Sequence, residues 1–143
     1  MNEIQILLVE DNEGDIVLTK ETFLDARIKN NVSIVRDGEE AINFLNSKVA
    51  NEIELLPDLI LLDINLPKID GKEVLQYIKN NAFLQKIPVV ILTTSSSETD
   101  MKAAYDYDAN CFISKPVDFD KLFSIFRLID DFWITIVKKP VNN

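Results

Sequence analysis

The 143-residue sequence predicts an α/β fold in which a five-stranded parallel sheet carries helices on both faces. Short runs rich in Ile, Val and Leu are typical of strands buried on both sides, and such strands occur in parallel sheets. Segments with helical spacing of apolar residues alternate with these runs. A strand and a helix in regular alternation, joined by right-handed crossovers, give a doubly wound sheet. The length corresponds to one domain.

Each predicted strand is followed by a predicted helix. The strands are the apolar runs at residues 4–9, 32–35, 59–62, 89–92 and 111–113. The apolar positions that mark the helices are Ile16, Phe23 and Leu24 for the first, Ala41, Ile42 and Leu45 for the second, Val74, Leu75 and Ile78 for the third, Met101, Ala104 and Tyr105 for the fourth, and Phe119, Leu122, Phe123, Phe126 and Ile129 for the fifth.

Two of these helices have a recognisable start. Asp37 and Asp70 each stand three residues before a glutamate, Glu40 and Glu73. An aspartate in this position caps the helix and the glutamate reaches back to it. Between the second helix and the third strand, residues 46–58 are predicted to form a long link.

The composition excludes several kinds of site. The glycines are Gly14, Gly38 and Gly71, and their spacing fits neither of the glycine-rich phosphate-binding loops. The sequence has no His, which excludes Ser-His-Asp and Cys-His nucleophiles and His-ligated zinc. Cys111 is the one cysteine, so an internal disulfide is excluded and a reducing compartment is indicated.

The charge balance indicates which partners to expect. The 24 Asp and Glu against 15 Lys and Arg give a net charge of −9, which disfavours binding to nucleic acid or to an anionic membrane. No apolar run approaches the ~20 residues of a transmembrane helix. The first residues lack the basic region of a signal peptide, so we expect a cytoplasmic protein.

Polar side chains follow four of the predicted strands. Glu10 and Asp11 follow the first, Asp63 the third, Thr93 the fourth and Lys115 the fifth. The carboxyl ends of parallel strands meet at one edge of the sheet, where such folds bind ligands. Each residue alone has a structural explanation, as a helix cap, a turn or a surface lysine, although Asp63 ends a buried strand where an unpaired charge is costly.

Together these residues predict one chemistry. Clustered carboxylates repel one another and require a cation, and their hard oxygens favour Mg²⁺. A carboxylate at such a site can act as the nucleophile and become an aspartyl-phosphate. A lysine and a hydroxyl can then bind the phosphoryl oxygens.

Four motifs carry a family resemblance: LLVEDN at 7–12, PDLILLDINLPKIDG at 57–71, VVILTTS at 89–95 and CFISKP at 111–116. In combination they resemble the receiver domain of two-component response regulators, over residues 4–132. The resemblance implies a flavodoxin-like sheet of strand order 2-1-3-4-5. It implies a receiver domain at residues 1–134 and a short tail at 135–143 with no output domain. The chain is also similar to small stand-alone regulators, some of which work with phytochrome-type histidine kinases.

The resemblance assigns a metal site and a phosphoacceptor. Asp63 resembles the aspartate that accepts the phosphoryl group. Asp11 resembles a direct Mg²⁺ ligand, and Glu10 resembles its acidic neighbour, which acts through water. Asn65 stands where a backbone carbonyl completes the metal site.

The resemblance also assigns the switch residues. Thr93 resembles the hydroxyl that turns toward the phosphoryl group, and Lys115 resembles the lysine that pairs with it. Phe112 stands at the aromatic switch position. Two residues depart from the commonest pattern: Glu10 replaces an aspartate, and Thr94 stands where a small residue is usual.

The resemblance implies a stand-alone response regulator, which accepts a phosphoryl group from a sensor histidine kinase or phosphotransfer protein onto Asp63. We expect it to signal through a downstream protein target, to form a homodimer through its fifth helix, and to show slow autodephosphorylation without being an enzyme.

One alternative is an Mg²⁺-dependent phosphatase of the haloacid-dehalogenase kind, in which Asn65 stands in place of the usual second acid. Another is a pseudo-receiver that binds partners without cycling phosphate.

Overall fold

The structure, a computed structural model, describes residues 3–24, 29–64, 66–93 and 111–114, the backbone alone for 93 and 111–114. Its elements in chain order are β1 (Ile4–Val9), α1 (Glu13–Leu24), β2 (Asn30–Val35), α2 (Gly38–Asn51), the 3₁₀ helix η1 (Ile53–Leu55), β3 (Leu59–Asp63), α3 (Gly71–Lys79), β4 (Val89–Thr93) and β5 (Cys111–Ser114). The fourth and fifth predicted helices lie outside the described residues.

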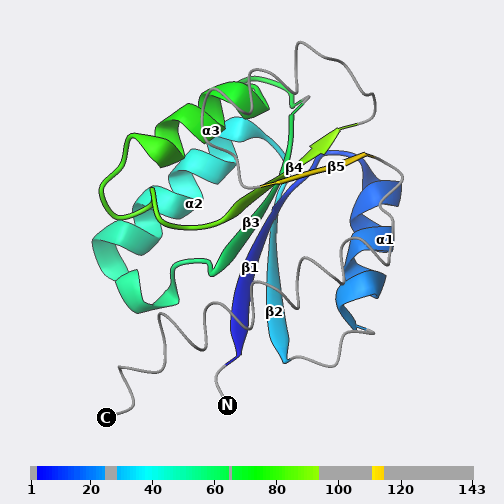
Figure 1. Cartoon of the computed structure of the whole chain (residues 1–143), viewed down its shortest axis with the longest axis horizontal. Coiled ribbons are helices and arrows are strands. Elements are labelled where there is room, and N and C mark those ends of the chain that lie inside the picture. The colour runs from blue at the N-terminus through cyan, green and yellow to red at the C-terminus, as the bar shows by residue number, and fades with distance from the viewer. Residues whose placement is uncertain (1–2, 25–28, 65, 94–110, 115–143) are drawn as a thin grey trace.

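The five strands form one parallel sheet in the order β2-β1-β3-β4-β5. The predicted fold class and strand order are thus confirmed. In Figure 1, α2 and α3 lie on one side of the sheet and α1 on the other. The order of the strands reverses between β1 and β3, which places the ligand-binding edge of this fold at the ends of those two central strands.

Successive residues of the central strands enter two separate hydrophobic clusters. Leu7 and Val9 of β1 pack in the cluster that contains α2 and α3, whereas Ile6 and Leu8 pack in the cluster that contains Ile16 of α1. This alternation is expected of a β-strand, because its successive side chains point to opposite faces of the sheet. Because both faces are covered, β3 is buried over its whole length, including the charged residue at its end.

The two predicted helix caps are present. Asp37 Oδ1 accepts a hydrogen bond of 2.8 Å from the backbone N–H of Glu40 at the start of α2. Asp70 Oδ1 accepts one of 3.0 Å from the N–H of Glu73 at the start of α3. Each cap satisfies a backbone donor that has no partner within its own helix.

The prediction of a link over residues 46–58 is wrong for its first part, because α2 continues to Asn51 and η1 follows. Val49 packs against the core one turn after the buried Leu45, which extends the apolar stripe of the helix. Lys48 forms an ion pair of 3.4 Å with Glu52 at the end of this extension. The polar residues around Val49 concealed the helical period in the sequence.

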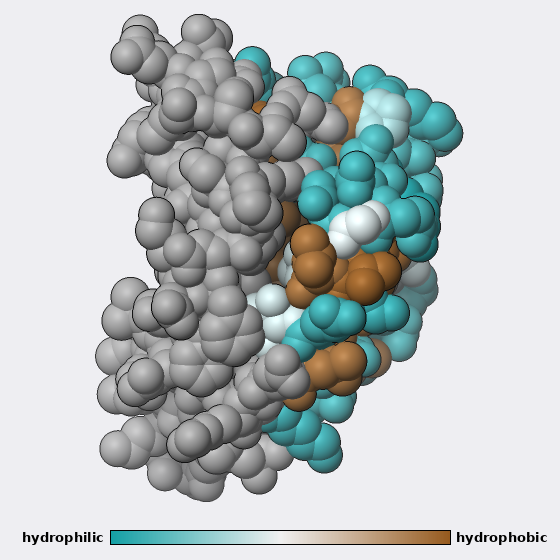
Figure 2. Space-filling model, turned by 90° about the vertical axis from the view of Figure 1, so that its right-hand side faces the viewer, coloured by the Kyte–Doolittle hydropathy of each residue, from teal (hydrophilic) through white to brown (hydrophobic). Residues whose placement is uncertain are grey.

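Apolar side chains also reach the surface on the side of the molecule that carries α1, where Figure 2 shows them in brown among hydrophilic residues. On α1 itself the exposed large apolar residues are Val17, Leu18 and Leu24. Within the described part of the chain, no helix is both long enough and apolar enough to cross a membrane.

Candidate functional site

The ends of β1 and β3 place two acidic residues side by side at the carboxyl edge of the sheet. Glu10 directly follows β1, and its backbone N–H still donates to Val35 O of β2 at 3.0 Å. Asp63 is the last residue of β3, and the next N–H, that of Ile64, donates to Leu92 O of β4 at 3.1 Å. Hydrogen bonds of the sheet therefore continue to both acidic residues, so the backbone that carries them is fixed.

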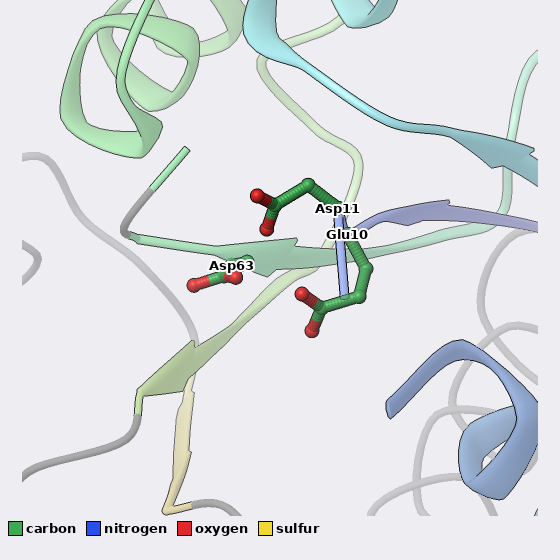
Figure 3. Close-up of side chains that lie close together, drawn as sticks. All are labelled: Glu10, Asp11 and Asp63. Atoms are coloured by element: carbon green, nitrogen blue, oxygen red, sulfur yellow. The ribbon is translucent and has the colours of Figure 1, made fainter. Parts of the chain in front are cut away.

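Three carboxylates meet at this edge. Glu10, Asp11 and Asp63 each offer an oxygen, and these oxygens lie within 4.8 Å of one another. Glu10 is 0% exposed and Asp63 3% exposed, whereas Asp11 is exposed. In Figure 3, Glu10 and Asp11 come from the end of β1 and Asp63 from the end of β3, and the carboxylates turn toward a common space. The structure thus brings together three of the predicted site residues.

Asn12 shapes the turn that carries Asp11, a role that was not predicted from the sequence. Its backbone N–H donates to Glu10 Oε2 at 3.2 Å. Its side-chain Oδ1 accepts from the N–H of Asp15 at 2.9 Å, which caps α1. Asparagine directly before a helix is a recognised capping signal, so the sequence did contain the information.

The start of α3 lies directly behind Asp63. A Cβ atom on Gly71 would lie 2.5 Å from the carbonyl oxygen of Asp63 and 2.6 Å from Cα of Ile64. The backbone N–H of Gly71 donates to Ile64 O at 3.0 Å. Only glycine allows this approach, so Gly71 is a supporting residue of the site that sequence reasoning did not identify.

The remaining predicted residues are described in part or not at all. Thr93 ends β4 and pairs in register with Ser114, and Phe112 of β5 pairs with Ile91 of β4. These backbone positions lie on the strands that extend the sheet beyond β3. The side chains of Thr93 and Phe112 lie outside the described part of the structure, as do Asn65 and Lys115 altogether.

The acidic cluster fits a divalent metal ion. Its donors are carboxylate oxygens from three residues, the ligand type that Mg²⁺, Mn²⁺ and Ca²⁺ prefer. Two of these carboxylates are buried, so the mutual repulsion of three negative charges acts where water screens it less than at an open surface. A bound cation would offset this repulsion.

Comparisons with known proteins identify the family. The family model described as "Response regulator receiver domain" matches residues 6–127. The response regulator Rcp1 of Synechocystis sp. is 44% identical over 135 residues, which span 94% of this chain and 92% of that protein.

Two solved structures extend the likeness to the fold. The phosphorylated cyanobacterial phytochrome response regulator RcpA matches with a TM-score of 0.78 at 44% identity, over 93% of this chain and 95% of its own. The Mn²⁺-bound form of Rcp1 matches with a TM-score of 0.75 at 43% identity, over 94% and 96%. Receiver domains bind a divalent metal and work with histidine kinases and downstream targets. The chain therefore belongs to the response regulator receiver domain family.

Proposed function

We propose that this receiver domain accepts a phosphoryl group on Asp63 from the phosphohistidine of a partner sensor histidine kinase or phosphotransfer protein. One observation carries the proposal: Asp63, buried at the end of β3, has a carboxylate oxygen within 4.8 Å of those of Glu10 and Asp11. Among the described residues this is the cluster of acidic side chains that could hold a metal ion.

We assign the metal site to four residues. Asp11 and Asp63 would bind Mg²⁺ directly, Glu10 would act through a water molecule, and Asn65 would contribute its backbone carbonyl. When bound, the ion would offset the negative charge of the phosphoryl oxygens, which the surrounding carboxylates would otherwise repel. Glu10 is the most buried of the carboxylates, which suits a residue that orients a ligand without contacting the phosphoryl group.

The transfer itself needs one nucleophile. An oxygen of the Asp63 carboxylate attacks phosphorus, a P–O bond forms, and the P–N bond to the donor imidazole breaks. The electron pair of that bond returns to the imidazole nitrogen, and the product is an aspartyl-phosphate. Lys115 would pair its ammonium with the phosphoryl oxygens, and Thr93 would donate its hydroxyl hydrogen to one of them.

The response is proposed to spread through β5 to the fifth helix. Phe112 would move with Thr93, and as phenylalanine it has no hydroxyl to donate. The predicted fifth helix, together with Trp133 beyond its marked positions in the sequence, would form a homodimer or a partner interface, because aromatic side chains are favoured in such interfaces. Sedimentation of wild type and Trp133→Ala with and without beryllofluoride tests this, and normal assembly together with normal kinase binding in the variant would exclude it.

The likeness to Rcp1 over most of that protein's length supports the proposal of a stand-alone regulator. Residues 1–134 would form the receiver and 135–143 a short tail, and Rcp1 is matched over 92% of its length. A phytochrome-type histidine kinase is the partner we propose, by likeness to the cyanobacterial phytochrome response regulator RcpA. With a single cysteine and a kinase partner, the working compartment would be the cytoplasm.

The protein is a receiver domain rather than an enzyme in the usual sense, and the comparisons give the phosphatase alternative no support. Its own hydrolytic reaction would be slow loss of the phosphoryl group to water. Mass spectrometry of the intact protein after incubation with acetyl phosphate and Mg²⁺ tests the proposal. Wild type should gain one phosphoryl mass, and Asp63→Asn should gain none; equal labelling of the two proteins would exclude Asp63 as the acceptor.

A further inference from the structure

Lys68, in the loop between β3 and α3, has an unusual backbone conformation. Its φ is 64°, the positive value that L-residues rarely adopt. It follows Pro67, and proline followed by a residue with positive φ is the pattern of a type II turn, where glycine or asparagine is usual. A lysine is unfavourable at this positive φ, so the contacts of its side chain are the feature that would explain why a lysine stands here.

The Lys68 side chain reaches the first turn of α2. Its Nζ lies 3.7 Å from Oδ2 of Asp37 and 4.0 Å from Oε2 of Glu39. The Asp37 side chain is 12% exposed, and its other oxygen accepts the capping hydrogen bond from Glu40. The ammonium group of Lys68 thus pairs with a carboxylate that is already held in place.

Backbone packing holds the same loop at two further points. A Cβ atom on Gly38, at the start of α2, would lie 2.0 Å from the carbonyl oxygen of Ile69, so α2 and the loop are in direct backbone contact. At the other end of the loop, Gly71 packs on Asp63 and hydrogen-bonds to Ile64. The loop therefore connects the start of α2 to the backbone of Asp63 through close contacts.

We infer that Lys68 is a positioning residue for the metal site: through Asp37 and Glu39 it holds the loop against α2, and so fixes Asp63 for metal binding. The inference rests on the proposed function of the acidic cluster. This inference predicts the opposite effect on Mg²⁺ affinity from the one that the charge of Lys68 alone would have. A lysine near a site for a divalent cation should weaken binding through its charge, whereas a positioning lysine strengthens it.

Isothermal titration calorimetry with Mg²⁺ separates the two effects. Lys68→Asn keeps a residue that tolerates positive φ and removes the charge, whereas Lys68→Arg keeps the charge. We expect Lys68→Asn to bind Mg²⁺ about threefold more weakly than wild type, the size typical of a partly exposed ion pair. Lys68→Arg should restore wild-type affinity. Equal or tighter binding by Lys68→Asn would overturn the inference.

Two further variants test the assignment of the partner. Asp37→Asn should weaken Mg²⁺ binding, and adding Lys68→Asn should then cost less than it does in wild type, because both changes remove the Lys68–Asp37 pair and only the Lys68–Glu39 pair is left to lose. Losses that multiply in the double variant would contradict the pairing. Lys86→Gln, an exposed lysine in the loop before β4, controls for the loss of a positive charge and should leave the affinity unchanged.

Thermal unfolding without metal confirms that each variant is folded. A wild-type protein that binds no Mg²⁺ overturns the proposed metal site and this inference with it. Normal binding by wild type, with no loss in Lys68→Asn, overturns the inference alone.

Discussion

Gly71 packs so closely on Asp63 that a Cβ atom would lie 2.5 Å from the carbonyl oxygen of Asp63. The first residue of α3 is therefore also the support for the backbone of the proposed phosphoacceptor. Because Asp63 is the last residue of β3, its carbonyl cannot move aside without displacing the end of that strand. This contact connects the stability of the fold to the geometry of the site.

Gly71→Ala should destabilise the protein by about 1–3 kcal/mol, the usual effect of forcing an extra carbon into a packed region. It should also weaken Mg²⁺ binding, because the strain falls on Asp63. Urea unfolding and calorimetry measure the two effects. Gly14→Ala is the matched control, since its Cβ would meet the Asn12 side chain at 3.3 Å rather than backbone. Equal stability losses in the two variants would contradict this explanation.

Mg²⁺ should raise the melting temperature of wild type, because it binds the native state and offsets the repulsion among three carboxylates. At a hundredfold excess over Kd the gain in unfolding free energy is about 2.7 kcal/mol.

Without metal, Asp11→Asn should be more stable than wild type by up to about 1 kcal/mol. Glu21→Gln, on the exposed side of α1, removes the same charge elsewhere and should show no such gain. If Asp11→Asn melts no higher than wild type without metal, repulsion among the three carboxylates does not destabilise the protein.

The stability of α2 should depend on pH through Asp37. The hydrogen bond from the Glu40 backbone holds the pKa of Asp37 below its ordinary value of 3.8, and the Lys68 ammonium lowers it further against the opposing effect of burial. A carboxyl with a lower pKa in the folded state stabilises the fold when ionised. This contribution is complete above 3.8 and is lost as pH falls through the folded-state pKa.

Urea unfolding of wild type and Asp37→Asn at neutral pH and at several values below 3.8 measures this contribution. The difference in unfolding free energy should be largest at neutral pH and should shrink on acidification. A difference that stays constant, or that grows as pH falls, would contradict the role of the ionised carboxylate.

The sequence predicted the features that depend on local pattern. Strands such as β1 and caps such as Asp37 follow from the nature and spacing of neighbouring residues. The grouping of Glu10, Asp11 and Asp63 followed from one further rule, that the carboxyl ends of parallel strands share an edge.

Other features depend on contacts between distant segments, and the sequence did not predict them. The pairing of Lys68 with Asp37 and the approach of Gly38 to Ile69 join loops that follow different strands. Neither apolar periodicity nor capping patterns report such contacts. The continuation of α2 to Asn51 was missed because Val49 is its one strong apolar signal beyond Leu45.

Loss of the phosphoryl group to water should be slow in this protein. Asn65 carries no charge with which to act as a base toward water. Thr94, the next residue after Thr93 in the sequence, is larger than the small residue that the resemblance leads us to expect there. Thr94→Ala should therefore speed dephosphorylation. The decay of the phosphorylated protein, followed by intact-mass measurement after removal of acetyl phosphate, gives the rate. An unchanged or slower decay in Thr94→Ala would count against this steric effect.

In the proposed reaction the phosphoryl group ends on Asp63 and on no other residue. Borohydride reduces an aspartyl-phosphate to homoserine, so the modified residue can be located by peptide mass spectrometry after labelling with acetyl phosphate and Mg²⁺. We expect homoserine at position 63 in wild type, and none when Mg²⁺ is removed by chelation. Homoserine at position 11 or at any other aspartate, with position 63 unmodified, would contradict this assignment.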